Sequence, residues 1–149
     1  MDLFKAMEIS ATGMNTQRVV MGVISTNIAN AQTTRTEAGG PYRRQLAILS
    51  PTSPPSPFFD LLSSRIGRGP SGQESLGVKA KVVEDPGLFR IVYDPSHPDA
   101  DETGYVALPN VNVMEEMVYL LGAVRSYEAN VTTFNAAKGM ILKSLEIGR

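Results

Sequence analysis

The sequence contains no cysteine and a single histidine, His97. Without cysteine the chain cannot form a disulfide framework, a thiolate zinc site or a cysteine nucleophile. This absence removes several classes of catalytic and metal-binding protein. It does not identify the compartment, because a chain without thiols can work on either side of a membrane.

An excess of one charge and long apolar runs are also missing. The 149 residues carry 14 basic and 15 acidic side chains, with no basic run that could follow a phosphate backbone. No stretch approaches the roughly 18 apolar residues that suggest a membrane span. The start of the chain has an acid at Asp2 and no uninterrupted apolar run behind it, so no Sec-type signal peptide is predicted. We therefore expect neither a nucleic-acid partner nor a direct membrane span.

The last third of the chain, residues 109–149, predicts one long helix. Its apolar residues recur at alternating steps of four and three, a spacing that suits a partner helix in a coiled coil. The row is broken once, at Lys138. Pro109 blocks a helix from entering, Asn112 can cap the first turn, and Glu115 can complete a capping box. The predicted interface residues of this helix are Val113, Met117, Leu120, Val124, Tyr127, Val131, Phe134, Ile141 and Leu145.

The first 36 residues predict a second, weaker helix, from Leu3 to about Asn30. Gly13 and Gly22 each cost a helix about 1 kcal/mol relative to alanine. An apolar residue recurs at every seventh position from Met7 to Ile28. A second row with the same spacing begins with Leu3 and ends with Ile24, and its two middle positions are the polar Ser10 and Gln17. The predicted interface residues of this helix are Leu3, Met7, Met14, Met21, Ile24 and Ile28.

Both predicted helices have few charges. Arg18 is the one charged residue from Ile9 to Thr34, and Glu128 is the one from Ser126 to Ala137. Uncharged polar side chains can form hydrogen bonds across a close helix contact without the cost of burying a charge. We therefore expect both helices to be covered on more than one face, with other chains supplying the cover.

Residues 37–108 predict a small β-rich, loop-rich middle module. Strands are expected at residues 42–49, 76–83 and 89–93, with the last two paired across the turn at Asp85, Pro86 and Gly87. Residues 50–75 are rich in proline, glycine and serine and predict a flexible loop. The expected fold is mainly α, with the long N- and C-terminal helices paired as an antiparallel coiled coil beside this module.

The chemistry of an enzyme is not evident in the sequence. Residues 94–102 gather acids around His97, but their spacing matches no metal-ligand pattern, and an ordered turn leading to the terminal helix is expected instead. Ser96 and His97 are sequence neighbours rather than a nucleophile and base brought together by a fold. No glycine-rich phosphate loop is present. We expect no catalytic, metal or cofactor site and no small-molecule substrate.

Several segments resemble the bacterial flagellar axial proteins of the rod and hook. Residues 11–17, 27–31 and 41–45 are similar to the family's N-terminal signature and to the strand that follows it, although residues 31–32 and 35–36 depart from its commoner form. Residues 93–101, 104–106, 109–111 and 125–130 are similar to a component of the proximal rod. The motif residues carried over are Asn27, Ala29, Asn30, Asp94, Pro95, His97, Pro98, Asp99, Pro109 and Asn110.

The resemblance implies a structural subunit of the flagellar basal-body rod, in the periplasm. Such subunits polymerise through their terminal helices into a helical tube that transmits torque and surrounds the export channel. The implied partners are other copies of the chain, other rod proteins and the flagellar type III export apparatus, which exports the chain without a cleaved signal peptide. Two alternatives are a soluble coiled-coil adaptor or chaperone that binds a partner helix, and a wall-cleaving hydrolase, for which the chain is too short.

Overall fold

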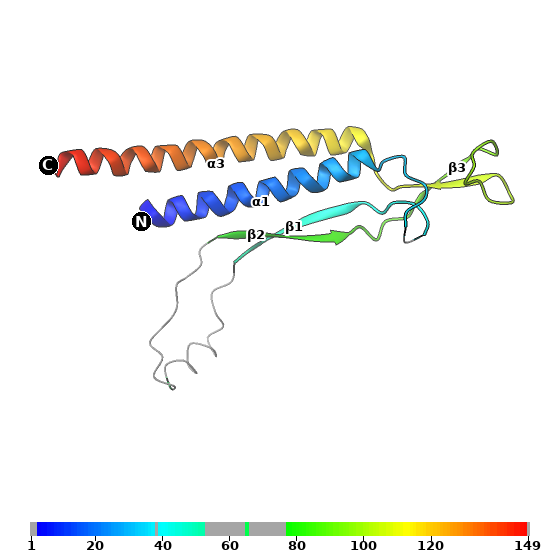
Figure 1. Ribbon diagram of the computed structural model, residues 1–149, viewed down its shortest axis with the longest axis horizontal. Helices are drawn as coiled ribbons and strands as arrows, with labels where there is room; N and C mark the ends of the chain where they lie inside the picture. Colours follow the sequence, from blue (N-terminus) through cyan, green and yellow to red (C-terminus); the bar gives the residue numbers. More distant parts are fainter. Residues whose placement is uncertain (1–2, 38, 53–64, 66–76, 149) are drawn as a thin grey trace. The chain divides into compact units, whose positions relative to one another are not determined.

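The computed structural model describes residues 3–37, 39–52, 65 and 77–148. In chain order, a long helix comes first, four short strands follow, and a second long helix ends the chain (Figure 1). The fold is therefore mainly helical with a β-rich middle, as the sequence predicts. The expected loop over 50–75 lies mostly outside the described residues. The elements are α1 (Leu3–Ala29), β1 (Gln45–Pro51), β2 (Val78–Glu84), β3 (Arg90–Tyr93), β4 (Tyr105–Leu108) and α3 (Val113–Ile147).

The contacts divide the chain into two compact units. The first contains α1 up to Thr16, the end of β1, the start of β2, and α3 from Tyr127 onward. The second contains α1 from Gln17, the start of β1, the end of β2, strands β3 and β4, and α3 up to Ser126. Each helix contributes one segment to each unit.

In the first unit, α1 is covered on two faces by its own chain. The Thr16 hydroxyl donates to the carbonyl oxygen of Val78 at 2.9 Å, and the Val78 amide donates to Thr12 Oγ1 at 3.3 Å. On another side, a Cβ added to Gly13 would lie 2.9 Å from Nδ2 of Asn130 on α3. The β-strand and the second helix therefore supply part of the cover that the low charge of α1 led us to expect from other chains.

In the second unit, apolar side chains of both helices and of the β3–β4 hairpin are buried. Val23, Ile24, Val106 and Ala123 are buried there. Strands β3 and β4 pair antiparallel, with Tyr93 opposite Tyr105. The rings of these two tyrosines pack edge to face with centroids 5.2 Å apart. Apart from Val106 and the half-buried Leu108, the side chains of the two strands are exposed.

The strand pairing differs from the sequence prediction. Strand β2 pairs with β1, and β3 pairs with β4, so the expected hairpin between residues 76–83 and 89–93 is wrong. The Asp85 amide donates to the Arg44 carbonyl, and the Thr52 amide donates to the Gly77 carbonyl, both at 2.8 Å, which makes β1 and β2 antiparallel. The Gly87 amide does bond the Asp85 carboxylate, as in an Asx turn, but the backbone makes no turn at residues 85–87. Contacts between residues distant in the sequence decide the pairing, and β4 was not anticipated.

Helix α3 has the predicted start and a modified cap. Its first residue is Val113, and Asn112 Oδ1 accepts a hydrogen bond from the Met114 amide at 3.1 Å. Glu115 accepts a hydrogen bond from the Asn112 side-chain amide at 3.0 Å, rather than from the backbone amide as in the usual capping box. The cap is therefore confirmed, with the partner atom changed. Within the described residues, no helix is long and apolar enough to cross a membrane.

Many neutral polar side chains bond to their own helix rather than to another. Ser10, Thr26, Ser126, Thr132 and Thr133 each donate to a carbonyl oxygen four residues earlier, at 2.9 Å. Their hydroxyl donors are therefore satisfied before any neighbour arrives. A helix surface of this kind can be covered without leaving those donors unpaired.

Candidate functional site

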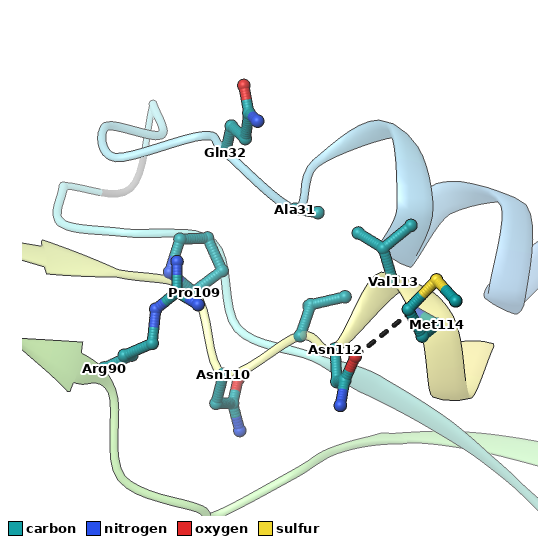
Figure 2. Close-up of a pocket in the computed structure, with 9 residues that line it drawn as sticks. Ala31, Gln32, Arg90, Pro109, Asn110, Asn112, Val113 and Met114 are labelled. Carbon is teal, nitrogen blue, oxygen red and sulfur yellow. Dashed lines mark hydrogen bonds between the residues drawn. The ribbon is translucent and has the colours of Figure 1, made fainter. Parts of the chain in front are cut away.

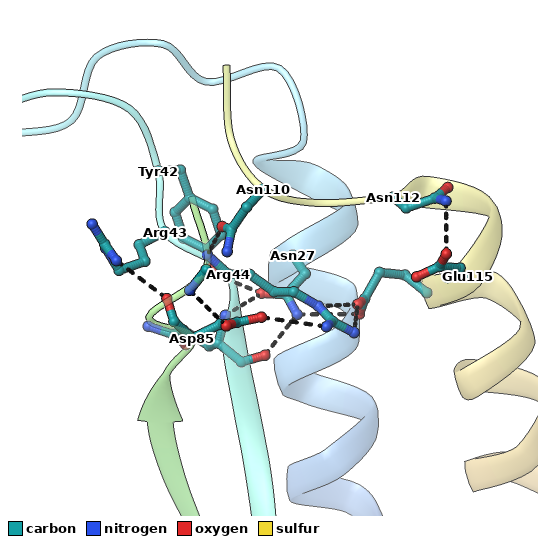
Figure 3. A network of polar contacts seen from close by, with 11 residues as sticks. Asn27, Tyr42, Arg43, Arg44, Asp85, Asn110, Asn112 and Glu115 are labelled. Carbon is teal, nitrogen blue, oxygen red and sulfur yellow. Dashed lines mark hydrogen bonds and ion pairs between the residues drawn. The ribbon is translucent and has the colours of Figure 1, made fainter. Parts of the chain in front are cut away.

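A buried polar cluster joins both helices to the start of β1 (Figure 3). Asn27 is 1% exposed, and its amide uses its full hydrogen-bonding capacity. Its Oδ1 accepts from the Gln45 amide and the Tyr42 hydroxyl, both at 2.9 Å. Its Nδ2 donates to the Gln45 carbonyl at 2.8 Å and to Glu116 Oε2 at 3.1 Å. Asn27 thus holds the first residue of β1 and the first turn of α3 to the end of α1.

Glu116 is the acidic partner in this cluster. It is also 1% exposed, and its Oε1 accepts from Nε and Nη2 of Arg44 at 2.7 and 2.6 Å. A second carboxylate, Asp85, lies 3.5 Å from Arg44 Nη1, while the Arg44 backbone amide donates to Asn110 Oδ1 at 2.9 Å. Within the described residues, every buried side-chain nitrogen and oxygen has a hydrogen-bond partner. The buried charge is therefore fully paired, as a dry interior requires.

The electrostatics of the cluster favour the charged form of Arg44. Burial alone would lower the pKa of Arg44, but the hydrogen bond to Glu116 and its charge, with Asp85 and Tyr119 adding, raise that pKa. Burial raises the pKa of Tyr42, and the charges of Glu116 and Glu84 raise it further. Tyr42 therefore remains a neutral hydroxyl donor to Asn27.

The covered side of α3 is displaced by one residue from part of the predicted row. Val113, Leu120, Tyr127, Phe134 and Ile141 are half-buried, as are Val124 and Val131. Met117 and Leu145, however, are 47% and 66% exposed. Three buried positions, Glu116, Ala123 and Ala137, directly precede positions of the predicted row, and Asn130 is half-buried like Val131, which follows it. Whether the predicted residues contact other subunits stays a prediction.

The predicted row of α1 agrees more closely with its covered side. Ile24 is buried, and Ser10, a polar exception in the row, is 4% exposed. Asn27, carried over from the family motif, is the most buried residue of the helix. The other predicted interface residues are half-buried, namely Leu3, Met7, Met14, Met21 and Ile28.

The first half of α3 also presents an exposed apolar stripe. Met114, Met117, Val118 and Leu121 follow the i, i+3, i+4, i+7 spacing of a single helix face. They are 73%, 47%, 66% and 61% exposed. The last half of α3 also exposes apolar residues, although they are spread over more than one face, namely Met140, Leu142, Leu145 and Ile147. Exposed apolar surface of this extent is typical of an interaction site.

A cavity of about 510 Å³ lies where the chain enters α3 (Figure 2). Arg90 is the one charged residue in its lining. Two of its polar side chains are engaged elsewhere, because Asn110 accepts from the Arg44 amide and Asn112 caps the helix. The cavity thus offers no arranged pair of nucleophile and base among its nine lining residues, which are Ala31, Gln32, Arg90, Pro109, Asn110, Val111, Asn112, Val113 and Met114.

The acidic loop around His97 closes the β3–β4 hairpin instead of leading into α3, which corrects the expectation from sequence. Asp94 Oδ1 accepts from the amide and hydroxyl of Ser96, and His97 Nδ1 accepts from the Asp99 amide. The pKa of Asp94 is lowered, mainly by the Ser96 hydroxyl. In the described part of the chain, no group of three or more His, Asp or Glu side chains could hold a metal ion.

The remaining motif residues have local structural roles. The Asn30 amide donates to the Thr26 carbonyl at 2.9 Å, and the Thr33 hydroxyl donates to Asn30 Oδ1 at 3.2 Å, so Asn30 closes the end of α1. Thr34 donates to Asp99 at 2.7 Å. Pro109 is buried, whereas Ala29, Pro95 and Pro98 are exposed.

Sequence reasoning missed Glu116, Arg44 and Tyr42 as members of a buried cluster. A usable signal was present, because Glu116, Ala123, Asn130 and Ala137 recur every seven residues beside the apolar row. These small and polar residues carry little hydrophobic signal, and Met117 and Val124 are the more apolar choice at neighbouring positions.

Comparison with known proteins identifies relatives along the whole chain. A family model described as flagellar basal body rod FlgEFG protein C-terminal matches residues 102–147. The chain is 46% identical to the flagellar basal-body rod protein FlgC of Bacillus subtilis (strain 168), with 100% of both chains covered. Its identity to FlgC of Borreliella burgdorferi is 43%, over 99% of this chain and 98% of the relative. Identity to FlgC of Salmonella typhimurium is 34%, with both chains fully covered.

Proposed function

The chain belongs to the FlgC family of flagellar basal-body rod proteins, and we propose that it is a structural subunit of the rod that polymerises through its terminal helices. Its partners are other copies of itself and other rod proteins. The helices form a tube that transmits torque and surrounds the export channel. The observation that carries this proposal is the exposed apolar stripe at the start of α3.

The stripe supports assembly because it is arranged for another helix. Met114, Val118 and Leu121 lie on one side of α3 at successive turns, and Met117 adjoins them. A shallow depression lined by Met114, Glu115, Val118 and Tyr119 runs along the same surface. Burying four such side chains against neighbours would contribute roughly 1.5–3 kcal/mol each. That gain offsets the entropy of ordering the helix ends.

Within one subunit, α1 and α3 pair as an antiparallel coiled coil. Two contacts support this pairing: Asn27 with Glu116, and Gly13 with Asn130. Asn27 and Gly13 are separated along α1 by the same number of residues as Asn130 and Glu116 along α3, and the order is reversed. One antiparallel register therefore satisfies both contacts. The covered positions of α3, which recur every seven residues, form the row that pairs with α1.

The subunit reaches the periplasm through the flagellar type III export apparatus, without a cleaved signal peptide. A narrow channel requires an unfolded or barely folded passenger. The α1 sequence supports this route, because Gly13, Gly22 and many residues of modest helix propensity keep the helix marginal outside an assembly. Order would then arrive with the contacts between subunits.

The role is structural rather than enzymatic. The relatives that match over the full chain carry the names of rod proteins, and the cavity beside α3 lacks an arranged catalytic pair among its lining residues. The same full-length similarity does not favour the alternative of a soluble adaptor or chaperone.

Extraction of basal bodies tests the proposal. In a strain that depends on this chain, the wild-type protein should co-purify with detergent-extracted basal bodies. Val118→Asp and Leu121→Asp should be expressed normally and be absent from that fraction, because each places a charge in the apolar stripe. Arg125→Asp, on the polar continuation of α3, is the matched control and should assemble. Normal assembly of both stripe variants would overturn the role of the stripe.

A further inference from the structure

The apolar rows of the two helices are nearly periodic. Met7, Met14, Met21 and Ile28 recur every seven residues on α1, and Val113, Leu120, Tyr127, Phe134 and Ile141 do so on α3. A slide of one helix along the other by seven residues, roughly 10 Å, would again place apolar residues against apolar residues. The apolar rows alone therefore distinguish poorly between the correct register and its neighbours.

The buried polar cluster breaks this periodicity. Asn27 and Glu116 are each 1% exposed and bond to each other at 3.1 Å. The positions seven residues away carry apolar side chains, Val20 before Asn27 on α1 and Ala123 after Glu116 on α3. Asn130, two heptads after Glu116, is polar but only half-buried. The buried polar pair therefore marks one place where the two helices meet.

We infer that Asn27, Arg44 and Glu116 form a register key, a set of buried polar residues that permits one alignment of α1 with α3. This inference concerns pairing within a single chain and does not rest on the proposed polymerisation. A slip in one direction would place Glu116 beside Val20, and a slip in the other would place Asn27 beside Ala123. Either slip leaves a buried polar group without its partner, which is more costly than a missing apolar contact.

The key also makes the alignment depend on a third element. Arg44 precedes β1, and it donates two hydrogen bonds from its guanidinium to Glu116 Oε1. Its backbone amide is held by Asn110, just before α3. The backbone amide and carbonyl of Gln45 both hydrogen-bond to the Asn27 side chain, which takes the place of a neighbouring strand. Correct alignment of the helices therefore depends also on the start of β1, which bonds to both polar side chains.

Cysteine pairs test this inference, because the chain has no cysteine of its own. Gly13→Cys with Asn130→Cys reports the observed register, since these positions are in close contact. Gly13→Cys with Ala123→Cys and Gly13→Cys with Ala137→Cys report a slip of one heptad in either direction. The purified full-length chains are oxidised in trimethylamine N-oxide, which favours compact states, and intramolecular disulfides are measured by mass spectrometry.

In the otherwise wild-type chain, the Gly13–Asn130 pair should form at least roughly tenfold more disulfide than either slipped pair, as one unsatisfied buried polar group implies. Adding Glu116→Leu should remove most of this preference, while circular dichroism shows that helix is retained. Glu116→Gln keeps the shape but offers one acceptor oxygen to the donors of Arg44 and Asn27, so it should retain only part of the preference. Glu128→Leu, on the exposed side of α3, controls for the added leucine.

Three results would overturn the inference. The wild-type chain could cross-link all three pairs equally, which would show that no register is preferred. The Glu116→Leu chain could retain the full preference for Gly13–Asn130, which would assign the register to the apolar rows. Alternatively, that chain could lose its helices altogether, which would make Glu116 a source of stability rather than of alignment.

Discussion

At the scale of single residues, the two glycines of α1 have different surroundings. A Cβ added to Gly13 would lie 2.9 Å from the Asn130 side chain, whereas one added to Gly22 would meet no described atom within 4 Å. Gly22→Ala should therefore raise the free energy of unfolding by about 1 kcal/mol through helix propensity. Gly13→Ala should gain less, because Asn130 must move. Urea denaturation followed by circular dichroism measures both changes.

The matched control is Gly13→Ala combined with Asn130→Ala, which removes the side chain that the new methyl group meets. The double variant should recover the gain that Gly13→Ala lacks. Equal stabilisation by Gly13→Ala and Gly22→Ala would show that the close approach at Gly13 has no energetic weight.

Two exposed aspartates make the β3–β4 hairpin loop sensitive to acid. The pKa of Asp101 is lowered by hydrogen bonds from the Thr103 hydroxyl and the Tyr105 amide, and that of Asp94 by the Ser96 hydroxyl and amide. Because the folded-state values lie below the ordinary 3.8, both carboxylates stabilise the loop above that pH. Their contribution is lost as the pH falls through the lowered values.

Amide chemical shifts should follow this loss between about pH 5 and about pH 2. The Thr103 and Tyr105 amides should report Asp101, and the Ser96 amide should report Asp94. Asp101→Asn should abolish the transition at Thr103 and leave the transition at Ser96. Titration at Ser96 and Thr103 with ordinary aspartate pKa values would contradict the prediction.

At the scale of elements, the half-buried row of α3 should be intolerant of charge. Leu120→Asp and Val124→Asp should each abolish incorporation into the rod while expression stays intact. The reason is that burying a carboxylate without a partner costs several kcal/mol. Ser126→Asp, at an exposed position of the same helix, should be incorporated. Immunoblots of basal bodies and swimming assays measure the outcome. Normal motility of the Leu120 and Val124 variants would show that the half-buried row of α3 is not needed for incorporation.

The helices could be predicted from sequence, because their signals are local. The apolar period of α3 and its Asn112 cap lie within a few residues of the features that they determine. The strand pairing could not be predicted, since Asp85 bonds both to the nearby Gly87 and to the distant Arg44. The local contact with Gly87 is visible in the sequence, whereas the ion pair that brings β2 to β1 is not.

The buried cluster was hidden for the same reason. Nothing adjacent to Glu116 in the sequence marks it as covered, and its partners come from α1 and from the residue before β1. Choosing the more apolar Met117 moved the predicted row away from the covered positions by one residue. The family motif did include Asn27, although its role became evident only from the four hydrogen bonds of its side chain.

At the scale of the whole molecule, the isolated chain should be less helical than the assembled subunit. Helices α1 and α3 comprise 27 and 35 residues, and the exposed apolar groups of α3 have no cover from the described part of the chain. Far-ultraviolet circular dichroism of a dilute sample should give less helix than these lengths imply. The helix content should rise with protein concentration as copies associate.

Sedimentation measured on the same samples provides the control, because the gain in helix should accompany the appearance of larger species. A compact monomer with two fully formed, rigid helices at every concentration would contradict this expectation.

The Asn27–Glu116 contact has a consequence for the timing of folding. The two side chains are 89 positions apart, and a ribosome makes the first of them long before the second. Until the last third of the chain has been synthesised, the Asn27 side chain has water in place of Glu116. The nascent amino-terminal segment therefore cannot reach its final arrangement before the last third has been made, which helps to keep the chain unfolded for export.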